Sequence, residues 1–392
     1  MVHFSGSLGG GMNTNALQVM LEILCAATAT FAALWVLQPL AIRFGLLDRP
    51  AGRKDHAEPT PSTGGIAMLI GVSLTLAVCN SWSQPLACFM IAATLLVAIG
   101  VLDDLFDVRW WIRVIAQCAA VWVMSLGGVG VEHIGLAIGV QSMGLGMFSL
   151  PFTMFATVGV INAINMTDGV DGLAGGIVLA SLCMLEAAAL YSGNYALAER
   201  LAVFGAAVFG FLLMNMRFPW QPRARVFMGN AGSALLGLTI AWASFRLTQN
   251  AAHPVTPILA PFLVATPLID CVVLIARRTL HGQSPFRADR NHMHHRMLEA
   301  GFTPAQVTIS LVATNLAIGL AASVALKLGL PEPALVLLFI ALCIGYFWLT
   351  RKRVRAVEFF ATLHGFLPAV FRKSNGALAP QSNGAENYPL GE

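Results

Sequence analysis

The carboxylates and histidines of this chain are concentrated in a few short polar windows between hydrophobic stretches. These windows contain Asp48, Asp103, Asp104, Asp107, Asp168, Asp171, Asp289, His292, His294 and His295. Ionisable groups are costly at membrane depth, so a set gathered at the ends of hydrophobic stretches indicates a functional site. Most arginines and lysines share the same windows, which predicts a membrane enzyme whose chemistry lies at its cytoplasmic face.

The window GVLDDLFDV ends a hydrophobic stretch with three carboxylates. On a helix, Asp103 and Asp107 share one face and Asp104 is their neighbour. Because adjacent carboxylates repel, a positive group is needed beside them. Mg²⁺ prefers oxygen ligands and accepts water and a substrate phosphate in its remaining positions. The alternative is a solvated helix end that Arg109 and Arg113 neutralise.

The window NAINMTDGVDGLAGG places Asp168 and Asp171 among glycines at the start of the next helix. Glycine lets a backbone approach a ligand closely, and a helix N-terminus offers free N–H groups to an anion. The segment therefore suits a nucleotide or a sugar phosphate. A plain turn would not need Asn162 and Asn165 together with both carboxylates.

The last window, RADRNHMHH, combines Arg290 with His292, His294 and His295. Arginine and histidine together suit a diphosphate or sugar hydroxyls. A metal site is the weaker alternative because no cysteine accompanies the histidines and several arginines crowd them. A plain loop is the other alternative.

Two further windows are less specific. RARVFMGNAGSALLG offers Phe227 to stack on a flat ring and Ser233 to cap a helix. An early proline-rich loop carries Lys54 and His56, which could hold phosphate. That loop could equally be a basic anchor on the cytoplasmic side.

The elements that position these windows are membrane helices. The chain is 57% hydrophobic and only 11% charged, far below the charged fraction of soluble proteins. We expect an all-α integral membrane protein of about eleven helices, each near the ~20 residues that cross a bilayer. The apolar stretches cover roughly 17–40, 64–80, 85–102, 110–127, 150–166, 172–192, 197–216, 233–250, 255–276, 305–326 and 332–350.

The basic residues predict the orientation. Of the 23 lysines and arginines, all but Arg200, Arg246 and Lys327 fall in alternate connections or in the tail. Short basic loops stay in the cytoplasm, so the N-terminus is expected in the periplasm and the C-terminus in the cytoplasm of a bacterial inner membrane. The active-site cleft would then face the cytoplasm.

Three parts are expected along the chain. Residues 1–16 form a disordered extension, 17–350 the polytopic membrane domain, and 351–392 a tail that is first basic and then disordered. A basic tail beside a final helix is drawn to anionic lipid. The seven cysteines lie in or beside hydrophobic stretches without paired spacing, so they are expected to pack as apolar residues. Nothing indicates a nucleic-acid site.

Taken together, the five windows resemble those of the polyprenyl-phosphate N-acetylhexosamine-1-phosphate transferases. The likeness runs from about residue 46 to 297. The context RADRNHMHH is similar to that of the bacterial undecaprenyl-phosphate N-acetylglucosamine-1-phosphate transferases, which begin O-antigen and related surface glycans. It is less similar to that of the muramoyl-pentapeptide branch.

The resemblance implies a substrate pair and a cofactor. N-acetylhexosamine 1-phosphate, GlcNAc-1-phosphate first among them, would pass from a UDP-sugar to undecaprenyl phosphate with release of UMP. Mg²⁺ or Mn²⁺ would be required, membrane lipid would surround the enzyme, and a homodimer stays open. Two anions must meet in this reaction, so metal and basic residues would act mainly by positioning and screening.

The resemblance also implies residue roles. Asp103 and Asp104 would bind the metal or the lipid phosphate, and Asp104 would act as a base. The other roles are nucleotide binding and catalysis for Asn165, Asp168 and Asp171, uracil stacking for Phe227, sugar recognition for His292, His294 and His295, and phosphate contact for Lys54 and His56.

One residue departs from the family pattern. Asn230 stands where the family has an aspartate that is regarded as a metal ligand. An amide oxygen brings no charge, so metal should bind more weakly here. The explanations are a natural variant that compensates, a weakly active or inactive relative, and a deliberate substitution. For the function itself, the same fold with a different UDP-N-acetylhexosamine donor is an alternative. A non-enzyme alternative is a lipid or nucleotide-sugar carrier, although such carriers bury polar groups near the midplane and show repeats.

Overall fold

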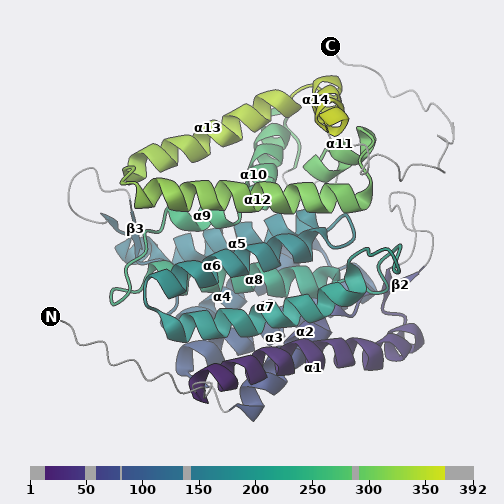
Figure 1. The fold of residues 1–392 in the computed structure, drawn as a ribbon, viewed down its shortest axis with the longest axis vertical. Helices are drawn as coiled ribbons and strands as arrows, with labels where there is room; N and C mark the ends of the chain where they lie inside the picture. Colours follow the sequence, from purple (N-terminus) through teal and green to yellow (C-terminus); the bar gives the residue numbers. More distant parts are fainter. Residues whose placement is uncertain (1–13, 49–58, 80–81, 136–142, 285–290, 367–392) are drawn as a thin grey trace, which may run out of the picture.

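The computed structural model describes residues 14–48, 59–79, 82–135, 143–284 and 291–366. Most of these residues are helical (Figure 1). The helices are α1 (Thr14–Phe44), α2 (Gly64–Val78), α3 (Gln84–Phe106), α4 (Trp110–Leu126), α5 (Ser149–Thr167), α6 (Leu173–Tyr191), α7 (Tyr195–Asn215), α8 (Gly229–Thr248), α9 (Leu259–Leu263), α10 (Ala265–Leu280), α11 (Met293–Glu299), α12 (Pro304–Lys327), α13 (Glu332–Thr350) and α14 (Arg353–Phe366).

The remaining regular structure is minor. Strand β1 (Leu47–Asp48) pairs with β2 (Thr60–Pro61), and β3 (His133–Ile134) pairs with β4 (Met143–Gly144), both antiparallel. A short 3₁₀ turn, η1 (Gly146–Phe148), precedes α5. The predicted disordered extension and the end of the tail lie almost wholly outside the described residues.

Every predicted apolar stretch contains helix. Seven helical segments in the described part of the chain are long and apolar enough to cross a membrane: α1, α3, η1 with α5, α6, α7, α12 and α13. α2 and α4 are shorter apolar helices. The stretch 255–276 is divided at Val264 into α9 and α10. The all-helical, multi-pass class is therefore confirmed, and the count of eleven spans stays a prediction.

Helix α8 lies at the centre of the bundle, where it contacts α2, α3, α5, α6 and α7 (Figure 1). Small residues allow these contacts, because a Cβ on Gly65 would lie 2.3 Å from the backbone nitrogen of Gly232, and one on Gly100 2.3 Å from Cα of Ala231. Such close backbone approach is typical of membrane helix packing. Since protein surrounds α8, its outer surface needs less apolar character than a lipid-facing helix.

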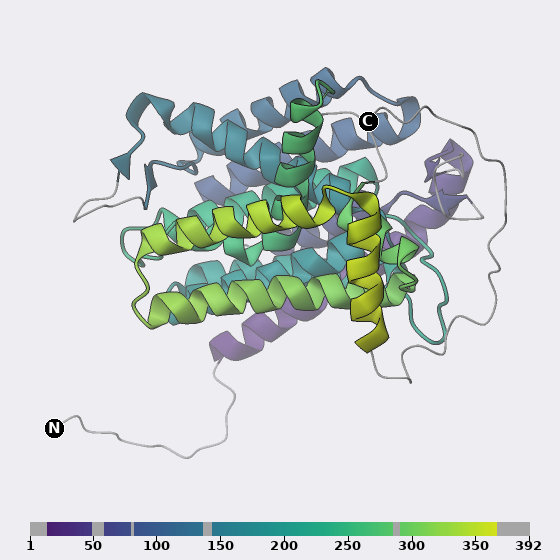
Figure 2. The same cartoon turned by 90° about the horizontal axis from the view of Figure 1, so that it is seen from above.

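The polar windows meet at one end of the bundle. In Figure 1 this end lies to the right, where β2, α11 and α14 are found, while β3 and the α12–α13 connection lie at the opposite end. Figure 2, the view from above, shows α14 running across the end of the bundle, nearly at right angles to α13. The helices thus bring together windows that are far apart in the sequence.

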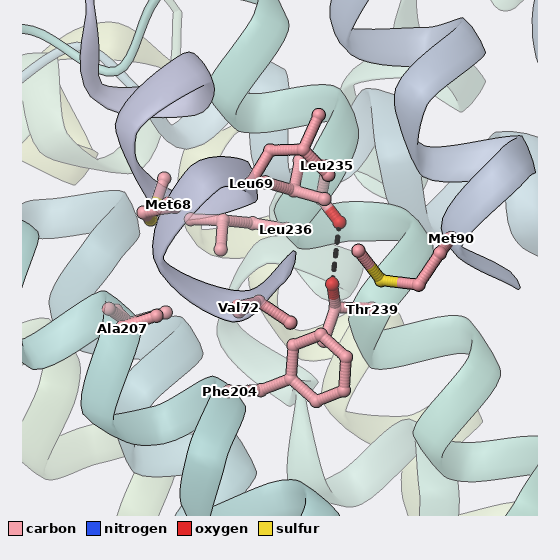
Figure 3. A pocket seen from close by; sticks show the side chains of 10 residues that line it. Met68, Leu69, Val72, Met90, Phe204, Ala207, Leu235, Leu236 and Thr239 are labelled. Carbon is pink, nitrogen blue, oxygen red and sulfur yellow. Dashed lines mark hydrogen bonds between the residues drawn. The ribbon is translucent and has the colours of Figure 1, made fainter. Parts of the chain in front are cut away.

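An apolar hollow lies among α2, α3, α7 and α8, away from these windows (Figure 3). Met68, Met90 and Phe204 line it. The hydroxyl of Thr239 donates to the carbonyl oxygen of Leu235 at 2.8 Å, and the other side chains that line this cavity of about 10 Å³ are apolar. The hollow is a packing feature of the core.

Candidate active site

Asp104 joins the end of α3 to the beginning of α8. The backbone N–H of Asn230 donates to Asp104 Oδ1 at 3.0 Å. Gly229 makes this approach possible, because its φ of 69° suits glycine and a Cβ there would lie 2.3 Å from Asp104 Oδ2. Oδ2 is buried and has no hydrogen-bond partner among the described residues. A carboxylate seated on a helix N-terminus thus keeps one oxygen for a cation.

Asp103 has a different environment from its neighbour. Arg113 Nη1 donates to its Oδ2 at 2.9 Å, and the backbone N–H of Val108 donates to its Oδ1 at 2.8 Å. This buried side chain closes the end of α3, where Asp107 takes a left-handed conformation with a φ of 52°. Asp103 therefore has a structural role, and its role as a metal ligand stays a prediction.

Two asparagines of α5 line a small cavity of about 40 Å³ beside Asp103. Asn162 Nδ2 donates to Gln117 Oε1 at 3.2 Å. Asn165 Nδ2 donates to both Asn230 Oδ1 and Ser233 Oγ at 2.9 Å. The structure thus brings the predicted asparagines together with the start of α8. Within the described residues, the oxygen that Asn230 would offer to a metal is already an acceptor for Asn165.

Asp168 follows the end of α5. The residue is exposed to solvent, although many protein atoms lie around its carboxyl group. The partial loss of hydration that these atoms cause, followed by the negative charges of Asp104, Asp48 and Asp171, raises the pKa of Asp168 to about 7. Asp104 and Asp168 therefore lie close enough to repel each other, and a positive group between them would relieve that repulsion.

Asp171 is held by neighbouring elements. Arg217 Nε donates to its Oδ2 at 2.7 Å, and the backbone N–H of Ala224 donates to the same oxygen at 3.1 Å. Its backbone carbonyl accepts from Thr308 Oγ1 at 3.0 Å. Asp171 thus ties the loop after α5 to α12 and to the connection between α7 and α8. Its predicted catalytic role is not tested by these contacts.

His292, His294 and His295, called here the histidine window, pack against residues 168–172 between α5 and α6, called here the acidic loop. His292 and His294 are buried and stacked, with ring centroids 5.5 Å apart, and the rings of His294 and His295 are 4.2 Å apart. A Cβ on Gly169 would lie 2.3 Å from His294 Nε2, so His294 lies directly on the residue after Asp168. Burial, followed by His295 and His292, lowers the pKa of His294 well below its usual value. His294 is therefore neutral at physiological pH.

The remaining predicted residues are less well placed. Phe227 is half-buried, its N–H donates to Pro61 O at 2.8 Å, and its carbonyl accepts from Gly64 N at 3.0 Å. These contacts place it beside the start of α2 and leave its stacking role a prediction. Lys54, His56 and Arg290 lie outside the described residues.

Sequence reasoning overlooked Asp270. This carboxylate lies within the apolar stretch 255–276 and accepts from His292 Nδ1 at 2.9 Å. The signal that could have revealed it is its isolation, because a lone acid inside a hydrophobic helix needs a buried partner. Arg217 and Asn215 were likewise missed; Asn215 Oδ1 accepts from Gly172 N at 2.9 Å and holds the acidic loop.

The donor set fits a hard cation better than a soft one. Among the described residues no three His, Cys, Asp or Glu side chains are arranged as a complete metal site. Two carboxylates, Asp104 with its orphaned Oδ2 and the nearby Asp168, are available. Mg²⁺ is usually bound by one or two carboxylates together with water and substrate phosphates, so this pair suits it.

Comparison with known proteins gives one consistent result. The model of glycosyl transferase family 4 matches residues 86–248. An undecaprenyl-phosphate alpha-N-acetylglucosaminyl 1-phosphate transferase of Yersinia pestis is 33% identical over 347 residues, which cover 88% of this chain and 95% of that protein. The enzyme of the same name from Escherichia coli (strain K12) is 34% identical over 88% of this chain and 96% of its own length. This chain therefore belongs to the family of undecaprenyl-phosphate alpha-N-acetylglucosaminyl 1-phosphate transferases.

Proposed function

We propose that this protein transfers GlcNAc 1-phosphate from UDP-GlcNAc to undecaprenyl phosphate. An oxygen of the lipid phosphate attacks the phosphorus that bears the sugar. The bond from that phosphorus to the UMP oxygen breaks, so the products are a lipid-linked diphosphate sugar and UMP. The relatives that bear this name match nearly the whole membrane body, which is the observation that carries the proposal.

The geometry of the acidic loop supports this assignment. Asp104 and Asp168 would hold Mg²⁺, with Mn²⁺ as a substitute, and the ion would supply positive charge to the reacting phosphates. Asn230 lies at the same helix start and would add a neutral oxygen only by giving up its contact with Asn165. Asp103 and Asp171 hold the loops that carry these groups.

The histidine window supports recognition of the sugar. Neutral His294 can both donate and accept a hydrogen bond, which suits the hydroxyl and acetamido groups of an N-acetylhexosamine. His294 packs against the loop that contains Asp168. A donor sugar bound there would place its phosphate beside the carboxylate pair.

The proposal includes a location. The basic residues favour a bacterial inner membrane protein with its N-terminus in the periplasm, eleven spans and the site on the cytoplasmic side. In support, the acidic loop, the start of α8 and α11 all lie at one end of the bundle (Figure 1). The lipid-linked product would then enter O-antigen or related glycan synthesis.

The direct test supplies membranes that contain the protein with undecaprenyl phosphate and a panel of UDP-GlcNAc, UDP-GalNAc and UDP-MurNAc-pentapeptide. We expect UMP release with UDP-GlcNAc first, dependent on Mg²⁺. Binding of UDP-GlcNAc without UMP release at any metal concentration would contradict the proposal and favour a carrier or an inactive relative.

Asn230→Asp distinguishes a carrier from an inactive relative, because UMP release that appears only in this variant would indicate an inactive relative. The substitution also tests the metal role of Asn230. The added carboxylate would stand beside Asp104, so Mg²⁺ should bind more tightly. We expect half-activation at a Mg²⁺ concentration at least about threefold lower than for the natural chain. Ser233→Ala, which removes another acceptor of Asn165, is the control and should leave the metal titration in place. An unmoved titration in Asn230→Asp would refute the metal role of this position.

A further inference from the structure

Asp270 of α10 is a buried carboxylate with three hydrogen-bond donors. His292 Nδ1 lies 2.9 Å from its Oδ2. The backbone N–H of Met293 and the hydroxyl of Tyr346 donate to its Oδ1 at 3.1 and 2.7 Å. These donors come from the start of α11 and from α13, so one side chain joins three helices that are separate in sequence.

This arrangement satisfies the carboxylate almost completely. A buried charge is tolerated only when hydrogen bonds replace the water it has lost. Two of the three donors belong to consecutive residues at the beginning of α11, one from a side chain and one from the backbone. Asp270 therefore fixes both the ring of His292 and the backbone that leads into the other histidines.

The orientation of His292 has a chemical consequence. When Nδ1 of a neutral imidazole donates to a carboxylate, its Nε2 is left as an acceptor on the far side of the ring. The ring of His292 stacks on that of His294 with an angle of 10° between the planes. His294 in turn lies against Gly169, next to Asp168. A continuous series of contacts thus links α10 to the acidic loop.

We infer that Asp270 is a positioning residue for the transfer reaction. It orients the ring of His292 and fixes the hydrogen on Nδ1, and it thereby holds the histidine window against the donor sugar. The inference rests on the proposed function for its reaction. It differs from a purely structural tie, in which Asp270 would only connect α10, α11 and α13. In that case its loss would act on the fold and not through His292.

A double-mutant cycle tests the inference. Asp270→Asn, His292→Gln and the double variant are compared for kcat/KM with UDP-GlcNAc and, independently of turnover, for Kd of UDP-GlcNAc. We expect Asp270→Asn to lower kcat/KM and to raise Kd, each roughly 10- to 100-fold, as loss of an orienting partner does elsewhere. The double variant should be no worse than His292→Gln alone, because Asp270 acts through that ring.

Two controls keep the cycle interpretable. Tyr346→Phe removes one donor of Asp270 but keeps the contact with His292, so it should change kcat/KM less than Asp270→Asn. Glu22→Gln replaces a buried acid of α1 that pairs with Arg200 far from the site, and it should leave Kd unchanged. KM for undecaprenyl phosphate should stay within about twofold in every variant if the window serves the donor sugar.

Additive losses in the double variant, or Asp270→Asn within twofold of the natural chain in both quantities, would overturn the inference. If the natural chain released no UMP, the proposed function would fail instead. The Kd cycle would then still decide whether Asp270 acts through His292.

Discussion

At the scale of single residues, the adjacent acids Asp103 and Asp104 differ in their hydrogen-bond partners. The sequence predicts both as a metal-binding pair, because neighbouring carboxylates need a shared cation. Arg113 is named from the sequence only in the alternative, where it and Arg109 neutralise the whole acidic cluster. The sequence could not predict that Arg113 and the N–H of Val108 both bond to Asp103, since these contacts depend on how the chain turns after α3. Of the two acids, Asp104 is the one that keeps a buried oxygen without a hydrogen-bond partner among the described residues.

This difference predicts opposite phenotypes for two equivalent substitutions. Asp104→Asn should lower turnover roughly 100-fold with little change in thermal stability, because it removes charge from the reacting phosphates. Asp103→Asn should instead cost about 1–2 kcal/mol of folding free energy, a figure that allows for the partial exposure of Arg113. Thermal unfolding and UMP release in the same detergent measure both. Equal loss of turnover with unchanged stability in the two variants would contradict the division of roles.

The raised pKa of Asp168 gives a second prediction at this scale. A carboxyl with a pKa of about 7 carries its proton at pH 6 and loses it by pH 8. Protons therefore compete with Mg²⁺ at low pH, and affinity should rise with pH through this range. The rise in unfolding temperature caused by Mg²⁺ should accordingly be larger at pH 8 than at pH 6. In Asp168→Asn that pH dependence should become clearly weaker; an unchanged dependence would locate the titrating group elsewhere.

At the scale of elements, the hydrophobic stretches were enough to predict the helices, and the polar windows between them were enough to predict that these windows gather at one end of the bundle. They could not predict that α8 is enclosed by five other helices, because its sequence is merely apolar and rich in small residues. Nor could they show that α10 contributes Asp270 to the histidine window. Both features arise from packing between segments far apart in the sequence.

The packing of α8 can be tested at paired glycines. Gly65→Ala would place a Cβ 2.3 Å from the backbone of Gly232, which cannot move without displacing α8. We expect it to lower stability by about 1–3 kcal/mol and to reduce activity by moving Asn230 relative to Asp104. Gly159→Ala is the matched control, because a Cβ there meets nothing within 4 Å. That change should be neutral or slightly stabilising; equal effects would argue against tight packing at α8.

At the scale of the whole molecule, the predicted asymmetry corresponds to a real gathering of polar groups. Seven helical segments of the described chain could cross a membrane. The acidic loop, the start of α8 and the histidine window lie at the same end. The distribution of basic residues gives the proposed orientation of that end, towards the cytoplasm.

Labelling with a membrane-impermeant thiol reagent tests this orientation. In a chain whose seven cysteines are replaced by serine or alanine, Ala252→Cys between α8 and α9 should react in intact cells. Glu358→Cys in α14 should react only after the membrane is opened. Both positions are exposed, so accessibility alone does not distinguish them. The reverse pattern would place the site outside the cell.

The one-sided placement of Asp104, Asp168 and the histidines has a consequence for the fate of the product. If the reaction occurs as proposed, the new glycolipid is released into the leaflet in which its acceptor already resided. A diphosphate headgroup does not pass through hydrocarbon unaided. The lipid-linked sugar thus stays in the leaflet where it was made, and its transfer to the other leaflet requires a separate protein.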